Sequence, residues 1–264
     1  MSQQQRLNAL LELVILRGSV SIQDIVDELR VSAATARRDL NSLAEQRLVT
    51  RTHGGGMALG SGYELPLQYK IPRNAEAKVA IAQAVVGLVN FGDVIGLNGG
   101  TTTSEVSRVL GRSEHLIGHG DEPGVTIVTN ALNIAFELSI RPQVKIVVTG
   151  GVARRQSYEL VGPLVGETIN ELTLDLAILG VDGLSAEFGA TTIHEGEAEV
   201  SRQLADVAKR VIVVADASKL GKSTFARICP LGDIDTLVTD APVPDEIAQA
   251  LDRASVDVIV APRP

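Results

Sequence analysis

The sequence predicts an α/β protein in two parts, a small N-terminal unit of short helices with a β-hairpin and a larger, mostly parallel α/β domain. Residues 5–45 carry three short apolar stripes at helical spacing. From residue 74 onward, helical stretches alternate with short apolar runs rich in β-branched residues, which is typical of parallel strands covered on both faces. The stretch between is rich in Pro, Gly and Ser. We therefore expect domains at 1–57 and 74–264, joined by a linker at 58–73.

Charge is distributed unevenly along the 264 residues, whose formal net charge is −8. Residues 1–57 hold seven Arg against six Asp or Glu, whereas the remainder holds 17 basic and 26 acidic residues. An acidic body repels phosphate, so any contact with nucleic acid is expected in the N-terminal part. Aromatic residues make up 3% of the chain and Trp is absent, which predicts an aliphatic core.

Cysteine usage and hydropathy exclude several other classes of protein. The single cysteine, Cys229, rules out an internal disulfide and a cysteine cluster for zinc, and is interpreted as a packed side chain. The N-terminus lacks the pattern of a signal peptide, and no apolar run approaches the roughly 18–20 residues of a membrane span. A cytoplasmic protein is expected.

The first two helices have recognisable boundaries. Residues 5–17 place Leu and Val on one stripe, and Gly18 is expected to end that helix. Ser21 is the predicted N-cap of the second helix, with Asp24 at the capping-box position.

The third helix is expected to begin at Ser32, with Ala36, Leu40 and Leu43 facing inward. Two short helices joined by a tight turn form a helix-turn-helix, whose later helix is free to read DNA. Residues 48–52 then alternate apolar and polar, and Gly54–Gly56 suggests a flexible tip, so a β-wing is predicted. The polar side chains expected to face DNA are Ser32, Thr35, Arg37, Arg38, Asn41, Arg51 and His53. An ion pair between Arg38 and Asp39 or another acidic residue is an alternative to a DNA contact.

Seven apolar runs are candidate strands of the larger domain. They lie at residues 93–97, 125–129, 144–148, 174–179, 211–215, 235–239 and 256–260.

Ligands of doubly wound sheets bind outside the carboxyl ends of the strands, so the residues that follow each strand are the candidate binding residues. The first strand is followed by NGGTTT, where glycines, free amides and hydroxyls at a helix start would suit a phosphate. The motif matches neither a dinucleotide fingerprint nor a Walker loop. The candidate ligand residues are Asn98, Gly99, Gly100, Thr101, Thr102, Thr103, Asn130, Gly151, Asp182, Glu197 and Lys219.

Each of these residues also has a simpler interpretation. Taken singly, they are turns or caps, and Glu197 could be a first-turn carboxylate complementing a helix dipole. Lys219 would supply a point charge for phosphate. His115 and His119 beside Asp121 and Glu122 are not expected to hold a metal, because they lie in a loop. No arrangement of Ser, His and acid predicts a catalytic centre, and no cofactor is expected.

With these motifs identified, the chain resembles the DeoR family of bacterial transcriptional regulators over nearly its whole length. VSAATARRDLNSLAEQRLVTRTHGGG looks like that family's recognition helix and wing. EAKVAIAQ, GGTTT, TN at 129–130, TGG at 149–151, GVDG at 180–183 and DASKLG at 216–221 look like its sugar-phosphate sensor domain, which is similar in fold to ribose-5-phosphate isomerase and CoA transferases. Two departures are Asn98 with an extra Gly, where the family commonly has Asp before Gly-Thr-Thr, and a long connection at 111–124.

The resemblance implies a homo-oligomeric repressor of carbohydrate genes, either dimer or tetramer, that a phosphorylated sugar releases from double-stranded operator DNA. An activator is equally compatible with the sequence. A sugar-phosphate isomerase with a DNA-binding appendage is the alternative from another class, with Asp182, Glu197 and Lys219 as its available groups. Asn98 in place of an acid counts against that alternative.

Overall fold

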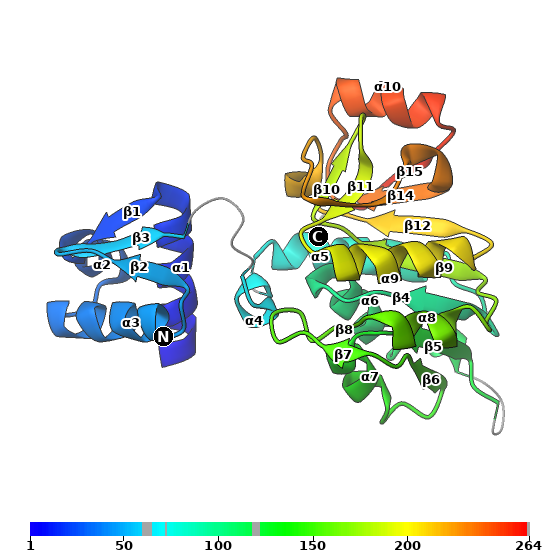
Figure 1. Cartoon of the computed structure of the whole chain (residues 1–264), viewed down its shortest axis with the longest axis horizontal. Coiled ribbons are helices and arrows are strands. Elements are labelled where there is room, and N and C mark those ends of the chain that lie inside the picture. The colour runs from blue at the N-terminus through cyan, green and yellow to red at the C-terminus, as the bar shows by residue number, and fades with distance from the viewer. Residues whose placement is uncertain (60–64, 72, 118–121, 263–264) are drawn as a thin grey trace. The chain divides into compact units, whose positions relative to one another are not determined.

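The computed structural model describes residues 1–59, 65–71, 73–117 and 122–262 (Figure 1). The chain divides into two compact units, Met1–Leu65 and Pro66–Pro264. The division lies within the predicted linker, but both ends of that linker have regular structure. A strand runs to Ala58, and a short helix, α4, spans Leu67–Lys70.

The first unit begins with three helices, α1 (Gln3–Arg17), α2 (Ile22–Leu29) and α3 (Ala33–Glu45). Their starts are fixed by serine caps: the hydroxyl oxygens of Ser21 and Ser32 accept hydrogen bonds from the backbone N–H of Asp24 and Thr35, at 3.1 and 3.2 Å. Gly18 ends α1 at a φ of 73°, as the sequence predicts. The predicted inward residues of α3, including Leu40 and Leu43, are buried in the helical core.

The wing differs from its prediction in one respect. Strands β1 (Ser19–Ser21), β3 (Gly55–Ala58) and β2 (Val49–Arg51) form a three-stranded sheet with β3 in the middle. Gly55 and Gly56 are therefore buried strand residues and not a flexible tip. A Cβ on Gly55 would lie 1.9 Å from the carbonyl oxygen of Val20, and one on Gly56 would lie 2.9 Å from Leu40. These glycines permit close packing rather than flexibility.

The second unit is built on a seven-stranded parallel sheet in the order β15-β14-β12-β9-β4-β5-β6. All seven predicted strands are present. The chain runs from β4 outward through β5 and β6, and then returns to β9 on the other side of β4, so the winding reverses between β4 and β9. The strands are β4 (Val94–Leu97), β5 (Val125–Thr129), β6 (Val144–Val148), β9 (Leu176–Gly180), β12 (Val211–Val214), β14 (Thr236–Thr239) and β15 (Asp257–Val260).

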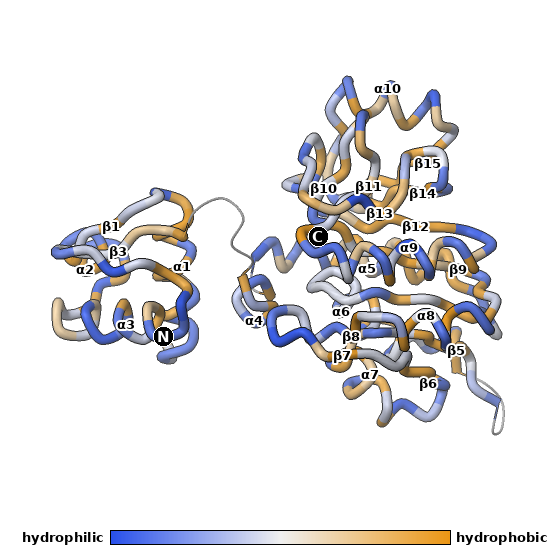
Figure 2. Tube along the Cα trace, in the orientation of Figure 1, coloured by the Kyte–Doolittle hydropathy of each residue, from blue (hydrophilic) through white to orange (hydrophobic). Residues whose placement is uncertain are grey.

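Helices cover both faces of this sheet, as continuous apolar strands require. Figure 2 shows β12 in hydrophobic colours. Ile212 and Val214 pack into the core on the side of α5, α6 and α7, whereas Val211 and Val213 pack with α8, α9 and α10. The helices are α5 (Ala75–Val86), α6 (Thr101–Leu110), α7 (Leu132–Leu138), α8 (Pro163–Ile169), α9 (Glu195–Asp206) and α10 (Asp245–Arg253), with 3₁₀ turns at Glu114–Leu116, Ala217–Lys219 and Leu231–Asp233.

Two smaller antiparallel sheets were not predicted. One contains β10 (Gly183–Ser185), β11 (Gly189–Thr192) and β13 (Ala226–Cys229), and the other pairs β7 (Val152–Ala153) with β8 (Leu160–Val161). Strands of two to four residues carry no usable alternation. Across the described ranges, no helix has the length and apolar character needed to cross a membrane.

Candidate functional site

The outer face of α3 carries the side chains that the sequence assigns to DNA. Arg37, Arg38 and Asn41 are exposed, whereas Thr35 is half-buried. The Arg38 guanidinium contacts the Thr35 hydroxyl at 3.4 Å. A helix with its apolar face buried and a row of Arg and Asn facing solvent has the form required for the major groove.

Asp39 anchors this helix and does not pair with Arg38. Its carboxylate is buried and accepts two hydrogen bonds from the guanidinium of Arg6 in α1, one of them at 3.1 Å from Nη2. The ion pair fixes α3 against α1, and the exposed Arg38 contacts Thr35 of its own helix instead. Of the two roles that the sequence left open for Arg38, the structure excludes pairing with Asp39.

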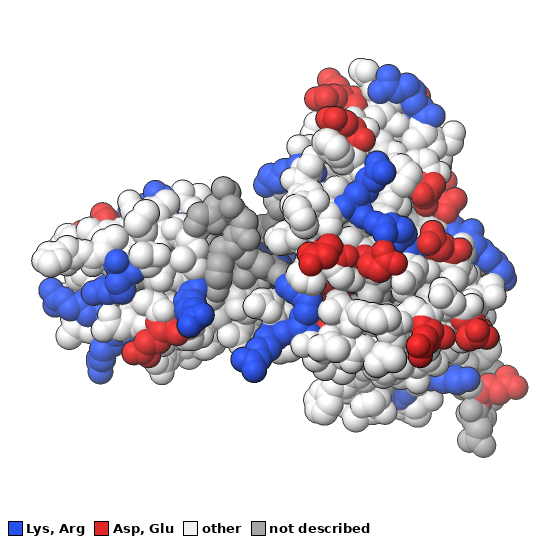
Figure 3. All heavy atoms as spheres, in the orientation of Figure 1, with Lys and Arg blue, Asp and Glu red and all other residues white. Residues whose placement is uncertain are grey.

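The wing presents Arg51 and His53 at the surface. The Arg51 guanidinium also donates to the carbonyl oxygen of Gly55 at 3.3 Å, which braces the turn between β2 and β3. Basic side chains are visible over this unit in the space-filling view (Figure 3). The predicted DNA-binding residues therefore all lie on α3, at its cap, or on the wing.

At the reversal point of the large sheet, Asn98 connects β4 to β9. Its Oδ1 accepts from the Gly180 N–H at 2.8 Å, and its Nδ2 donates to the Gly180 carbonyl at 2.9 Å and to the Ser201 hydroxyl at 3.0 Å. An aspartate could not make both donor contacts. The buried amide is thus engaged within the protein, at the point of the sheet where ligands of such folds bind.

Gly99 lies directly over a buried glutamate that the sequence analysis missed. Glu159 Oε2 accepts hydrogen bonds from the Gly99 N–H at 3.1 Å and from Asn130 Nδ2 at 3.0 Å. A Cβ on Gly99 would lie 2.3 Å from the Glu159 side chain, so this approach requires glycine. Tyr158, just before, has a φ of 63°, which turns the chain so that Glu159 faces inward. No periodic signal in the sequence identifies such a residue.

The first turn of α6 has no side-chain cap. Gly100 is its N-cap, at a φ of 130°, and provides no capping side chain. Thr103 is buried and its hydroxyl donates to the Gly100 carbonyl at 3.2 Å, whereas Thr101 and Thr102 are half-exposed. The first amides of a helix have no intrahelical acceptor, and they attract anions.

Asp182, which follows β9, and Lys219, which follows β12, form an ion pair at the carboxyl edge of the large sheet. Lys219 Nζ donates to Asp182 Oδ1 at 3.1 Å, and the Thr192 hydroxyl donates to Oδ2 at 3.0 Å. Burial acts to raise the pKa of Asp182, but the charges of Lys70 and Lys219 and these hydrogen bonds outweigh it, so the pKa is lowered. Asp182 is a carboxylate at neutral pH, and Lys219 is its cationic neighbour.

Glu197 and Gly151 are both engaged within the second unit. Glu197, in the first turn of α9, is buried and forms an ion pair with Arg154 at 3.3 Å, so it is not simply a solvated first-turn carboxylate. Gly151 has a φ of 129° and packs tightly against Leu160 and Val165. Among the contacts of the described residues, none joins Lys219 directly to Gly100–Thr103.

A second cation lies nearby and was also missed. Lys78 in α5 is buried, and its ammonium donates to backbone carbonyls of the turn after α4, at 3.0 Å for Lys70 and 3.4 Å for Ile71. Burial lowers the pKa of Lys78 to about 8, against an opposing effect of Asp216. The sequence feature that could have identified Lys78 is the EAKVAIAQ motif. This motif is part of the family resemblance, which gave it no role.

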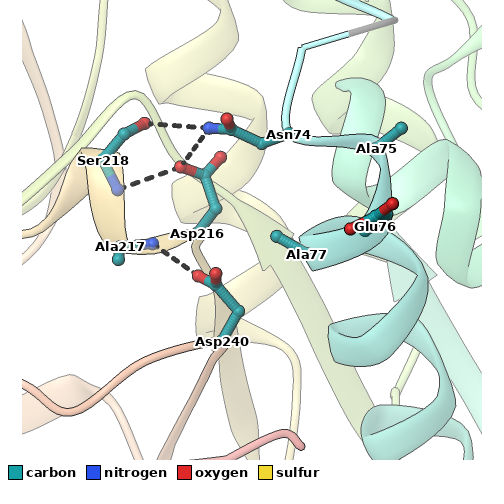
Figure 4. A pocket seen from close by; sticks show the side chains of 8 residues that line it. All are labelled: Asn74, Ala75, Glu76, Ala77, Asp216, Ala217, Ser218 and Asp240. Carbon is teal, nitrogen blue, oxygen red and sulfur yellow. Dashed lines mark hydrogen bonds between the residues drawn. The ribbon is translucent and has the colours of Figure 1, made fainter. Parts of the chain in front are cut away.

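A cavity of about 470 Å³ opens beside the turn that carries Lys219 (Figure 4). Asp216 Oδ1 accepts from Asn74 Nδ2 at 2.9 Å and from the Ser218 N–H at 3.0 Å, and Asp240 Oδ1 accepts from the Ala217 N–H at 2.7 Å. These carboxylates fix the turn. The cavity is lined by Asn74, Ala75, Glu76, Ala77, Asp216, Ala217, Ser218 and Asp240.

The histidine loop gives no metal site in the part of the chain that the structure describes, where no group of three or more His, Cys, Asp or Glu could hold an ion. His119 and Asp121 lie outside the described residues. Cys229 is buried, and burial raises the pKa of its thiol to about 12, which agrees with a packed side chain.

Comparisons with known proteins agree with both units. A model of the DeoR C terminal sensor domain matches residues 73–241, and a model of the DeoR-like helix-turn-helix domain matches residues 6–60. The chain is 34% identical to the HTH-type transcriptional regulator GlpR of Haloferax volcanii, over 97% of this chain and 96% of that protein. It is 32% identical to the glycerol-3-phosphate regulon repressor of Escherichia coli, over 95% of this chain and 96% of that protein.

The HTH-type transcriptional repressor GlcR of Bacillus subtilis is also 32% identical, over 98% of this chain and 97% of that protein. Among solved structures, ribose 5-phosphate isomerase A from Neisseria gonorrhoeae matches with a TM-score of 0.40 and 19% identity, over 55% of this chain and 53% of that one.

Proposed function

Because this chain belongs to the DeoR family of transcriptional regulators, and is thus a DNA-binding regulator of the helix-turn-helix type, we propose that it is a repressor released by a phosphorylated sugar. The phosphate would bind at the carboxyl edge of the large sheet. The genes controlled would belong to carbohydrate uptake or catabolism, as the name of one relative, a glycerol-3-phosphate regulon repressor, suggests. A regulator of this kind acts on DNA in the cytoplasm.

The uncapped N-terminus of α6 carries this proposal. Gly100 lets a ligand approach the first amides of α6, and the half-exposed Thr101 and Thr102 add hydroxyl donors. Backbone amides at a helix start favour an anion such as phosphate. On the same edge, Lys219 supplies a positive charge, and Asp182 supplies a carboxylate that can accept hydrogen bonds from sugar hydroxyls. The combination suits a ligand with an anionic end and a polyhydroxy end.

On the DNA side, we propose that Arg37, Arg38 and Asn41 approach base edges and phosphates, with Thr35 and the Ser32 cap at the start of the same helix. Arg51 and His53 would contact the backbone from the wing. Such proteins bind DNA as oligomers, because one module reads too few bases for high specificity, so a dimer or tetramer on repeated half-sites is expected.

Release requires that the sugar phosphate bind two states of the protein unequally. To invert a 99:1 distribution of DNA-competent and released states takes roughly 5.5 kcal/mol of differential affinity. Glu159 would relay this difference, because one oxygen of its carboxylate accepts hydrogen bonds from both Gly99 and Asn130, the residue after β5. A ligand that reorders Gly99–Thr103 would therefore act on two neighbouring strand ends.

The proposal does not include catalysis. A general base works best with a pKa near the operating pH. The pKa of Asp182 is lowered, and Glu197 is paired with Arg154, so neither carboxylate is poised to remove a proton. Asn98, at the position of a possible acid, is engaged with Gly180 and Ser201.

The test uses the full chain and a DNA duplex that it selects from a random pool. Ribose 5-phosphate, glucose 6-phosphate, fructose 1-phosphate and glycerol 3-phosphate are each titrated into the complex, with the parent sugars, glycerol and inorganic phosphate as controls. One phosphorylated compound should release the DNA at a concentration at which its parent does not. If the complex persists with every compound, the proposed effector class is wrong. Formation of an isomer of any added sugar would instead support the enzyme alternative.

A further inference from the structure

Helix α7 has an apolar outer face in addition to its apolar inner face. Ile134, Ala135 and Leu138 are buried in the core of the second unit. On the opposite side, Leu132, Phe136 and, in the turn that follows the helix, Ile140 are 41%, 82% and 77% exposed. We call these three outer residues the α7 stripe.

The surroundings of the α7 stripe are also poor in charge. The Leu132 N–H donates to the Tyr158 carbonyl at 3.0 Å, which places the exposed Tyr158 beside the start of the stripe. In the space-filling view the surface over the region of α7, β7 and β8 is mostly white, with charged residues at its margins (Figure 3). Glu137, the acidic residue within the helix, is paired with Arg108 at 3.0 Å. Exposed apolar patches of this kind mark interaction sites.

The order of residues in the stripe is symmetric. Leu132 and Ile140 each lie four residues from Phe136, so reversing the direction of the helix leaves an aliphatic side chain at either end and the aromatic ring in the middle. An interface with two-fold symmetry needs a patch that is complementary to itself. If two α7 helices pack antiparallel about an axis near Phe136, Leu132 meets the partner's Ile140, and the partner's Leu132 meets Ile140.

We propose that the α7 stripe is the surface on which a second copy of this chain docks, with the two-fold axis passing close to Phe136. The choice of a second copy as the occupant rests on the proposed function, because recognition of two DNA half-sites requires two copies. A stable interface buries about 800 Å² on each partner, and a buried aromatic side chain contributes about 150–250 Å² of it. Tyr158 and its neighbours are placed to supply more of this area.

Disulfide cross-linking tests the symmetry directly. The natural Cys229 is buried with a pKa of about 12, so an introduced cysteine is the reactive thiol. F136C should form a disulfide between copies. L132C by itself and I140C by itself should not, because each position lies four residues from the axis at Phe136, about 6 Å at the helical rise, so its two copies lie about 12 Å apart, beyond the ~7 Å that a disulfide spans. A mixture of L132C and I140C should cross-link. F225C is the control, since Phe225 is 81% exposed outside the stripe.

Sedimentation of the full chain without DNA gives a second test that needs no thiol. The natural chain should be dimeric or larger at micromolar concentration. F136D should raise the dissociation constant at least 100-fold and F225D should leave it within threefold, with far-UV circular dichroism unchanged in both. The proposal would be overturned if the natural chain is monomeric or if the F136D variant still associates. It would also be overturned if L132C cross-links to itself as well as the mixture of L132C and I140C does.

The two proposals can fail separately. Cross-linking through F136C, together with a DNA complex that no sugar phosphate releases, would support the interface and refute the proposed release. Release of DNA by a sugar phosphate with no cross-link at F136C would support the regulator and refute this interface.

Discussion

Replacing Lys219 by alanine should give a protein that binds its operator but responds poorly to the sugar phosphate. Lys219 lies in the second unit, on the 3₁₀ turn after β12, and its partner is Asp182 at 3.1 Å. No residue of the first unit depends on it among the described contacts. Affinity for DNA in the absence of effector should therefore change by less than twofold.

The magnitude follows from the single contact that is removed. A hydrogen bond to a charged group contributes about 1.5–3 kcal/mol, and each 1.4 kcal/mol corresponds to a tenfold change in affinity. The effector concentration for half-release should rise by about 10- to 150-fold. Loss of the pair with Asp182 itself should cost at most about 1 kcal/mol of stability, because the Lys219 side chain is partly exposed.

The chain contains a matched control at the opposite end of the same strands. Lys209 forms an ion pair with Asp175 at 2.8 Å, and Asp175 accepts the Val94 N–H at the start of β4. Lys209→Ala removes the same charge from the same type of pair. The assay is fluorescence anisotropy of labelled operator DNA, titrated with the effector for each variant. If Lys219→Ala releases DNA at the same effector concentration as the natural chain, this location of the phosphate is wrong. An equal loss of sensitivity to the effector in Lys209→Ala would also refute it.

Three further predictions concern the elements that hold the two sites. Gly99→Ala should lower the free energy of unfolding by about 1–3 kcal/mol, because its Cβ would overlap Glu159. As a control, Gly54→Ala should change it by less than about 0.5 kcal/mol, because no atom lies within 4 Å of its Cβ. Equal effects of the two substitutions in urea unfolding would contradict the packing described. Ser21→Ala should cost about 1 kcal/mol through loss of the α2 cap, and an unchanged urea midpoint for the first unit would count against the capping box. The lowered pKa of Asp182 stabilises the fold above its unfolded value of about 3.9, and this stabilisation is lost as the pH falls through the folded pKa. The stability difference between the natural chain and Asp182→Asn should therefore shrink below about pH 4, and a constant difference from pH 6 to pH 3 would be inconsistent with it.

Local signals in the sequence were sufficient for the seven parallel strands and for the starts of α2 and α3. Each of the seven parallel strands is a run of apolar residues that the sheet buries on both faces, so hydropathy identifies it without knowledge of its partners. Ser21 and Ser32 act on backbone groups three residues away, and such caps can be predicted from a short stretch of chain.

Features that depend on distant contacts could not be predicted in this way. Gly55 and Gly56 looked like a flexible tip because β1, which lies against them, is more than thirty residues earlier in the chain. Glu159 and Asn98 act through partners 60 and 82 residues away. Placing the strand-end loops at one edge followed from the topology of parallel sheets, but the pairing of side chains within that edge required the structure.

Reciprocal coupling between the two ligands tests the central claim most directly. Operator affinity is measured with and without saturating sugar phosphate, and affinity for the sugar phosphate is measured with and without operator DNA. If the compound acts by binding the second unit and shifting the protein away from its DNA-bound state, both ratios must be equal, and they should be 10-fold or greater. Binding of the sugar phosphate with the same affinity to the free and the DNA-bound protein would contradict the account.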